Sequence, residues 1–244
     1  MNRVQSPLAG SSGFAYVAGI AFVATFVLVS CDTGPGEPDP AVCRAEPVPG
    51  ALMPLAVGNH WDLHRIRAGI EAPLDTLRLL VSSEFSGEST SGLVTGFRRL
   101  QYRLGTPPPE TSRIEIGDGG VHRVAWVGPN DTLYVDNVPF PYPATMGTRS
   151  SLVRPFYDEG TWQIRDTLDV ELIAVDEVIE TPAGRFEAYV YKYYNPPPFD
   201  VLFGDDIYDY YVPGIGHVAQ IWKSPTDNSV KTSYFLVDYC LFGR

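Results

Sequence analysis

Thr181-Pro182-Ala183-Gly184 separates two strand-like runs, Val170–Ile179 and Phe186–Tyr193. Proline at the second position of a turn presets φ, and glycine at the fourth position tolerates a left-handed exit, so the tetrapeptide predicts a type I turn. The two runs then form an antiparallel β-hairpin. We expect this hairpin to be the best-specified unit of the domain.

A second turn follows the hairpin. Val212-Pro213-Gly214-Ile215 places proline before glycine, as a type II turn requires, and joins the runs Ile207–Tyr211 and His217–Trp222. The last strand-like run is Val230–Cys240, and it closes the domain.

Strand-like segments also recur before the hairpin. Gly117-Asp118-Gly119-Gly120 separates Arg113–Ile116 from Val121–Val127, which predicts another hairpin. Residues 99–104 alternate between polar and apolar side chains, the period of a half-buried strand, and we expect Leu100, Tyr102 and Leu104 on the buried face. No long amphipathic helix is evident. The sequence predicts an all-β domain.

The N-terminus is different in character. An apolar run of sixteen residues, Phe14 to Val29, ends at Leu28-Val29-Ser30-Cys31. This tetrapeptide resembles the lipobox of bacterial lipoproteins, which implies cleavage before Cys31, acylation of that cysteine and a membrane contact through the acyl anchor. The alternative is an uncleaved signal anchor.

The composition changes directly after Cys31. Residues 31–53 are rich in proline and glycine and poor in apolar side chains, which is typical of an extended tether. We therefore divide the chain into a signal peptide (1–30), a tether (31–53) and a β-rich extracytoplasmic domain (54–244). The predicted location is the bacterial cell envelope, and the sequence does not choose between membranes or oligomeric states.

The charge of the chain excludes one class of partner. The sequence has 18 basic and 29 acidic residues, and residues 31–244 retain 17 basic residues against all 29 acidic ones, a net charge of −12. Nucleic-acid phosphates require clustered Lys and Arg, so we expect no nucleic-acid partner.

Three motifs carry a further resemblance. Residues 181–189, residues 210–218 and the opening Pro54–Trp61 resemble a group of uncharacterised envelope lipoproteins. Some of these proteins are similar to the half-barrel carriers of the lipoprotein-localisation system. The resemblance implies a single, strongly curved antiparallel sheet, a half-barrel or barrel, and it supplies no catalytic residues.

Candidate chemistry is sparse. His60 and His64 have helical spacing for a metal, but their flanking residues indicate a strand, in which four residues span roughly 13 Å. The acidic cluster Asp205, Asp206 and Asp209 lacks EF-hand spacing and is typical of a solvated loop. No Gly-x-Ser-x-Gly motif is present. We expect no metal, no cofactor and no enzymatic activity, while a hydrolase site assembled across strands stays an alternative.

Two proline- and aromatic-rich segments are the candidate contact surface. The first is Pro139–Pro143, and the second begins at Asn195 and continues to Tyr211. Stiff aromatic loops suit an interface because they lose little entropy on binding. The residues predicted to form the partner or ligand surface are Phe199, Phe203, Tyr208, Tyr210, Tyr211, Tyr189 and Tyr191. The other interpretation is that these side chains fold back onto the core.

Two functions follow as hypotheses. The first is a non-enzymatic docking or scaffolding module for an envelope protein partner. The second is a carrier or sensor of a lipid or other apolar ligand in a half-barrel groove.

The remaining cysteines predict a disulfide. Once Cys31 is acylated, Cys43 and Cys240 are the two thiols left in an oxidising compartment. A bond between them closes a long loop, worth on the order of 5 kcal/mol in the chain-entropy model. Two unpaired buried thiols are the alternative.

Overall fold

The computed structural model describes residues 47–70, 72–89, 92–116, 120–194 and 205–242. These residues form one antiparallel sheet of twelve strands. The strands are β1 (His60–Arg67), β2 (Asp75–Ser89), β3 (Gly92–Arg103), β4 (Ser112–Ile116), β5 (Gly120–Val127), β6 (Thr132–Pro141), β7 (Arg149–Asp158), β8 (Thr161–Thr181), β9 (Gly184–Tyr194), β10 (Asp206–Val212), β11 (Gly216–Lys223) and β12 (Val230–Cys240). The all-β prediction is confirmed, and no helix in the described residues is long and apolar enough to cross a membrane.

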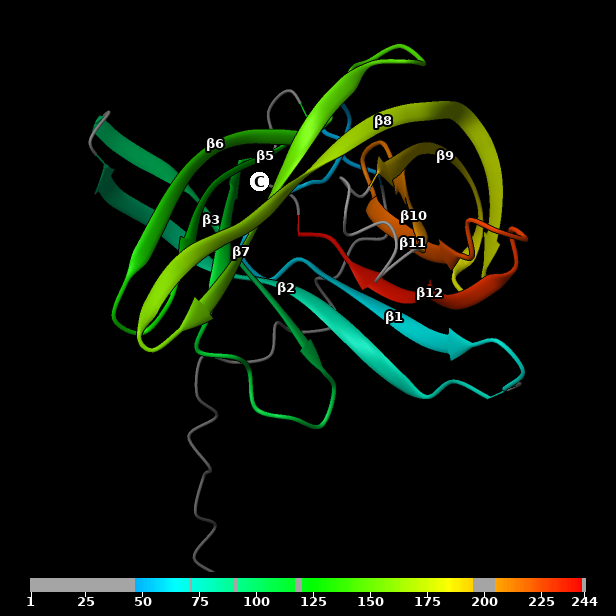
Figure 1. Ribbon diagram of the computed structural model, residues 1–244, viewed down its shortest axis with the longest axis horizontal. Coiled ribbons are helices and arrows are strands. Elements are labelled where there is room, and N and C mark those ends of the chain that lie inside the picture. The colour runs from blue at the N-terminus through cyan, green and yellow to red at the C-terminus, as the bar shows by residue number, and fades with distance from the viewer. Residues whose placement is uncertain (1–46, 71, 90–91, 117–119, 195–204, 243–244) are drawn as a thin grey trace, which may run out of the picture. The chain divides into compact units, whose positions relative to one another are not determined.

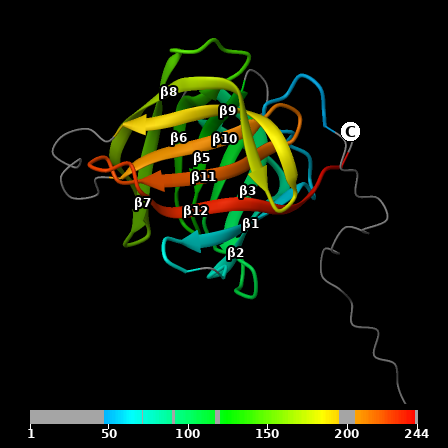
Figure 2. The same cartoon turned by 90° about the vertical axis from the view of Figure 1, so that its right-hand side faces the viewer.

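The sheet consists of two meanders joined at the chain ends. Its order is β6-β5-β4-β3-β2-β1-β12-β11-β10-β9-β8-β7, so that β1 pairs with β12 at the centre while β6 and β7 lie at opposite edges. Only residues 142–148 connect β6 to β7, and such a segment reaches at most about 25 Å. The sheet must therefore curl until its edges approach each other, and it is nearly closed into a barrel (Figures 1 and 2).

Side chains rather than a backbone ladder join the two edges. Asn137 on β6 donates from Nδ2 to the Ser151 carbonyl at 2.6 Å, and its Oδ1 accepts from the Val153 amide at 3.4 Å. Ser150 Oγ donates to the Pro139 carbonyl at 2.8 Å. Pro139 and Pro155 have no amide hydrogen to offer, which limits backbone pairing between β6 and β7.

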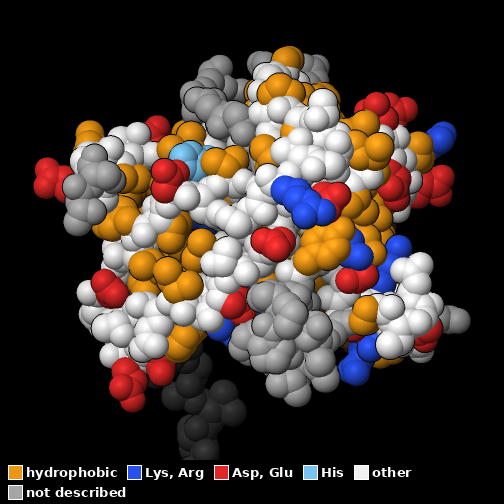
Figure 3. All heavy atoms as spheres, turned by 45° about the horizontal axis from the view of Figure 1, so that its top comes forward, with side chains coloured by type: hydrophobic (Ala, Val, Ile, Leu, Met, Phe, Trp, Pro, Cys, Tyr) orange, Lys and Arg blue, Asp and Glu red, His pale blue; other side chains and the backbone are white. Residues whose placement is uncertain are grey.

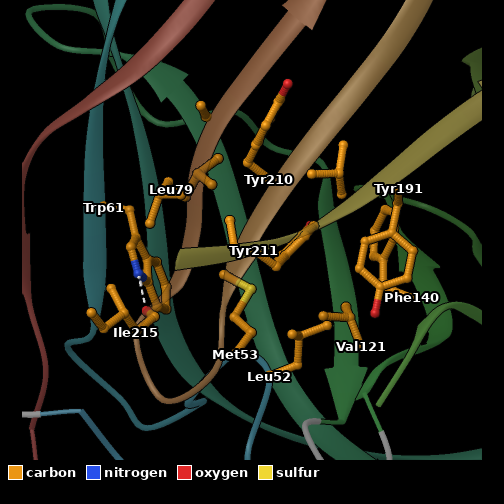
Figure 4. Close-up of a cluster of buried hydrophobic side chains, with 14 of the residues drawn as sticks. Leu52, Met53, Trp61, Leu79, Val121, Phe140, Tyr191, Tyr210, Tyr211 and Ile215 are labelled. Carbon is orange, nitrogen blue, oxygen red and sulfur yellow. Dashed lines mark hydrogen bonds between the residues drawn. The ribbon is translucent and has the colours of Figure 1, made fainter. Parts of the chain in front are cut away.

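The hydrophobic core fills part of the interior (Figure 4). Trp61 on β1 is fully buried, and its Nε1 donates to the Ile215 carbonyl at 2.6 Å. A Cβ on Gly216 would come within 3.0 Å of Trp61 Nε1, so the indole packs here because position 216 has no side chain. Phe140 packs edge-on against Tyr191 at 5.2 Å between ring centroids and tilted against Tyr211 at 4.8 Å.

The segment before β1 belongs to this core. Leu52 and Met53 are fully buried, although the sequence assigned residues 31–53 to the tether. The Val48 amide donates to the Gly214 carbonyl at 2.8 Å, and the Gly214 amide donates to the Ala51 carbonyl at 2.6 Å. The folded domain therefore includes the residues from 47 onward. Leu52 and Met53 lie in a proline-rich stretch, but their side chains are apolar and enter the core.

The turns predicted at residues 181–184 and 212–215 form as expected, whereas residues 117–119 of the third predicted turn lie outside the described residues. Thr181 pairs with Gly184 at the tip of the β8–β9 hairpin. In the second turn the Ile215 amide donates to the Val212 carbonyl at 3.0 Å, and Gly214 adopts a φ of +81°, as a type II turn requires. Strand β12 has the bounds that the sequence predicted.

Candidate functional site

A cavity of about 380 Å³ lies inside the curled sheet. Strands from both meanders line it, and its size falls at the lower end of the range for small-molecule sites. The polar and charged side chains on its lining include Arg99, Gln101, Arg113, Arg123, Arg154, Tyr193, Asp209, Tyr211, His217, Gln220 and Tyr234. The interior is therefore polar here, in contrast to the hydrophobic core around Trp61.

One wall carries three arginines from three neighbouring strands. Arg99 on β3 lies opposite Arg113 on β4, and Arg113 lies opposite Trp126 on β5. Arg123 on β5 lies opposite Glu115 on β4. Residues directly opposite each other on antiparallel strands share a face, so the pairing brings three guanidinium groups and one carboxylate together.

Glu115 is the centre of this wall. It is fully buried, with Arg99 Nε at 2.5 Å from Oε2 and Arg123 Nη2 at 3.1 Å from Oε1. Burial alone would raise the pKa of Glu115, but the charges of Arg99 and Arg123 outweigh it and lower the pKa to about 2. Glu115 is therefore ionised at neutral pH and forms ion pairs with two of the three arginines.

Arg113 is the third arginine, and no carboxylate pairs with it among the described residues. Its guanidinium lies over the Trp126 ring, 4.7 Å from the centroid. Burial and the charges of Arg123 and Arg99 lower the pKa of Arg113 to about 9, so the group stays charged at neutral pH. Like charges opposite each other across a ladder are destabilising, so Arg113 does not improve the stability of this wall.

The facing wall is built around Asp209 on β10. His217 Nε2 lies 3.2 Å from Oδ1 of Asp209, Gln220 Nε2 donates to the same oxygen at 2.7 Å, and the Tyr193 hydroxyl donates to Oδ2. Burial would raise the pKa of Asp209, but His217 and these hydrogen bonds outweigh it and lower the pKa. Burial and the Asp209 charge hold the pKa of Tyr193 well above its usual value, so the phenol stays a donor.

Several residues predicted for a contact surface lie in the core instead. Tyr191, Tyr210 and Tyr211 are 0%, 5% and 3% exposed. Tyr210 and Tyr211 point away from each other (Figure 4). Tyr211 packs against Phe140 in the interior, whereas Tyr210 is covered by the β8–β9 hairpin, and its hydroxyl donates to Oε1 of Glu177 on β8 at 3.5 Å. The Ala183 amide at the hairpin tip donates to the Leu236 carbonyl at 3.1 Å, which holds this cover in place.

The other predicted residues have different positions. Tyr189 and Tyr208 are partly buried, and Tyr208 lies beneath the ammonium groups of Lys192 and Lys223. Cys240 is buried at the end of β12. Cys31, Cys43, Phe199 and Phe203 lie outside the described residues, so the acylation, the disulfide and the aromatic loop stay predictions. On the face shown in Figure 3, hydrophobic side chains occur in separate groups among charged and neutral ones.

Sequence reasoning missed the arginine wall. Leu100 and Tyr102 are half-buried and Gln101 and Arg103 are exposed, as the alternation predicts. The prediction was wrong for Arg99, which is 5% exposed, and for Leu104, which lies beyond the end of β3 and is 42% exposed. Asp209 was assigned to a solvated loop, yet it is buried on β10, while Asp206 on the outside pairs with Lys192 at 2.8 Å. The one sequence signal for this wall was an arginine on each of three successive predicted strands. Successive strands become neighbours in one antiparallel sheet, so their arginines can come together.

The histidines do not assemble a metal site. His60 and His64 lie on strand β1, and the described residues contain no group of three or more His, Cys, Asp or Glu side chains that could hold a metal ion. His217 and Asp209 form a pair, but the described residues that line the cavity include no serine or cysteine to complete a nucleophilic triad.

No protein-family model matches the sequence, and no curated protein matches it. Two solved structures are similar in fold. One, from Parabacteroides distasonis and described as a lipoprotein, is 16% identical, with a TM-score of 0.46 over 79% of this chain and 99% of that chain. The other, from Bacteroides fragilis and described as an exported protein with a YmcC-like fold, is 15% identical, with a TM-score of 0.45 over 79% of this chain and 100% of that chain.

Proposed function

We propose that this chain is a non-enzymatic lipoprotein of the bacterial envelope that carries or senses a small molecule inside its curled sheet. The lipobox-like stretch ending at Cys31 supports the membrane anchor, and the cavity of about 380 Å³ supports the ligand. Of the two functions considered from the sequence, the cavity favours carriage over docking.

The cavity is the observation that carries this proposal. A protein interior is normally packed to a density that leaves few voids larger than a water molecule. Here the same sheet that packs Trp61 tightly leaves space for about a dozen waters at roughly 30 Å³ each. That volume suits a small molecule rather than a whole lipid with two acyl chains.

Docking of a protein partner has less support. Three of the seven residues predicted for the contact surface, Tyr191, Tyr210 and Tyr211, are buried in the core and cannot reach an external partner without unfolding. The polar lining also disfavours a wholly apolar ligand, because burying Arg113 against hydrocarbon would leave its charge uncompensated.

Native mass spectrometry of the detergent-solubilised full chain tests the proposal. After incubation with a small-molecule extract of its own envelope fraction, we expect one small molecule bound per chain. Leu77→Trp adds volume at the cavity lining and should abolish the adduct while circular dichroism shows a retained fold. Leu93→Trp, at an exposed position, is the matched control and should keep the adduct. Absence of any adduct on the unmodified protein would contradict the proposal.

A further inference from the structure

The arginine wall has a property that the proposed cavity alone does not explain: it has more positive charge than its partners neutralise. Four guanidinium groups, from Arg99, Arg113, Arg123 and Arg154, line the cavity, and three carboxylates contact side chains of its lining or belong to it: Glu115, Asp166 and Asp209. This positive excess lies inside a chain whose formal net charge is −11. Charge of this sign is therefore concentrated inside the sheet against the trend of the whole sequence.

Arg113 is the arginine of this wall that has no carboxylate partner among the described residues. Glu115 holds Arg99 and Arg123 through four hydrogen bonds of 2.5 to 3.2 Å, and Asp209 is held by His217, Gln220 and Tyr193. Among the described residues, Arg113 forms no hydrogen bond or ion pair and contacts Trp126 through the face of its ring. Its five N–H donors are thus available toward the cavity.

The polar atoms beside Arg113 are donors without partners as well. Ser112 is 4% exposed, and its Oγ has no hydrogen-bond partner among the described residues, nor does the buried Nε1 of Trp126. Both side chains line a hollow of about 220 Å³ that Arg113 also lines, and Arg113 and Trp126 line the main cavity too. Leaving a buried donor unsatisfied costs about 1–3 kcal/mol, so this corner of the fold lacks an acceptor.

One class of chemical group satisfies both Arg113 and Trp126, which line the main cavity. An oxyanion offers acceptor oxygens to a planar guanidinium fork in a bidentate arrangement, and it also neutralises the excess charge. The lining of the cavity also includes apolar side chains, among them Phe140, Leu152 and Leu168. A ligand that contacts both kinds of side chain has an anionic head and a compact apolar or aromatic body.

We infer that the cavity binds a small organic oxyanion, a carboxylate or phosphate ester with a compact apolar body, and that Arg113 with Trp126 forms the anion-binding end. This inference rests on the proposed function and names the ligand class of the same cavity. Arg99 and Arg123 serve as positioning residues, because Glu115 already engages them and they hold the wall in place.

Isothermal titration calorimetry with matched probes tests the inference on the detergent-solubilised full chain. The probes are benzoate, phenyl phosphate and phenyl sulfate, with benzyl alcohol as the neutral molecule of the same body. We expect at least one anion to bind at least tenfold more tightly than benzyl alcohol. The anion that binds best distinguishes a carboxylate, a phosphate and a sulfate ligand.

Variants locate the site. Arg113→Met should weaken binding of the anion by tenfold or more and leave benzyl alcohol unchanged, and Arg113→Lys, which keeps the charge but loses the fork, should fall between. Arg98→Met is the matched control. Arg98 is adjacent to Arg99 on β3, so its side chain is on the other face of the sheet, where it is paired with Ile114 on β4. Circular dichroism confirms that each variant is folded.

The outcomes separate this inference from the proposed function. If benzyl alcohol binds as tightly as the anions and Arg113→Met changes neither affinity, the cavity holds a ligand but the anionic end is wrong. If no probe binds while native mass spectrometry still shows a small neutral adduct, the inference is overturned and the carrier function stands. If neither experiment shows binding, both are overturned.

Discussion

The interior of the sheet has a hydrophobic part around Trp61 and a charged part around Glu115, and the two parts gain stability in different ways. Trp61, Leu52 and Met53 are fully buried and packed without polar groups left over. Around Glu115 the side chains are ionised, one arginine has no counter-ion among the described residues, and a cavity remains. The first part gains free energy from burial, whereas the second gains little from its charges. The ligand site that we propose accounts for this difference, because it gives the second part a role in binding.

The largest effect is expected from removing the central carboxylate. Glu115→Leu keeps the volume but leaves Arg99 and Arg123 buried without a counter-ion, and we expect the free energy of unfolding to fall by about 5 kcal/mol. Urea denaturation measures the loss. Glu84→Leu, at an exposed position of β2, is the control and should stay within about 0.5 kcal/mol of the unmodified protein. A loss below about 1 kcal/mol for Glu115→Leu would mean that the buried ion pairs do not form.

The hydrophobic part should be nearly as sensitive to truncation. Trp61→Ala removes the largest buried side chain and its hydrogen bond to the Ile215 carbonyl, and should cost about 4 kcal/mol in urea denaturation. Ile164→Ala, at a residue that is 57% exposed, should cost less than about 0.5 kcal/mol. Equal small losses for both variants would contradict the position of Trp61 in the core.

Acid should remove the contribution that Glu115 makes to the charged part. The pKa of Glu115 is lowered in the folded state to about 2, so its contribution is present above the unfolded pKa near 4.5 and is lost as pH falls through 2. A shift of this size corresponds to on the order of 3 kcal/mol. Urea denaturation at several pH values between 7 and 2 should show an acid-induced loss that is smaller by about this amount in Glu115→Leu. Identical pH dependence in both proteins would contradict the assignment.

A smaller, local effect is expected where the sheet edges meet. Asn137→Ala removes the side chain that joins β6 to β7 and leaves the Ser151 carbonyl without its donor, at a cost of about 1–2 kcal/mol. Hydrogen exchange at the Val153 amide should become faster, while amides of β1 and β12 keep their protection. Uniformly faster exchange across all strands would show that the edge contact is not a local feature.

The sequence predicts the fold well and the cavity poorly, for a physical reason. Turns such as 181–184 and 212–215 are specified by proline and glycine at fixed positions, so the hairpins and the last strand are readable from local sequence. The arginine wall depends on register between strands and on which face of β3 turns inward. Arg99 has the polar signature of a solvent-facing residue, and only its pairing with Glu115 makes its burial favourable.

The folded boundary was missed for a similar reason. Leu52 and Met53 stand within a proline-rich stretch whose composition is that of a tether, and their burial depends on the hydrogen bonds between residues 48–51 and Gly214. Gly214 is far away in the sequence. The amino-acid composition predicts a tether, but it does not predict the residue at which the tether ends and the folded domain begins.

The stability of Arg113→Met tests most directly whether the charged part is kept for binding. Urea denaturation of the ligand-free variant should give a free energy of unfolding equal to that of the unmodified protein within about 0.5 kcal/mol, or higher. The substitution relieves repulsion with Arg99 and Arg123, and this gain offsets the lost attraction to Glu115 and the lost ring contact with Trp126. A fall of more than about 1 kcal/mol would contradict the account, because it would make Arg113 a structural residue of the wall.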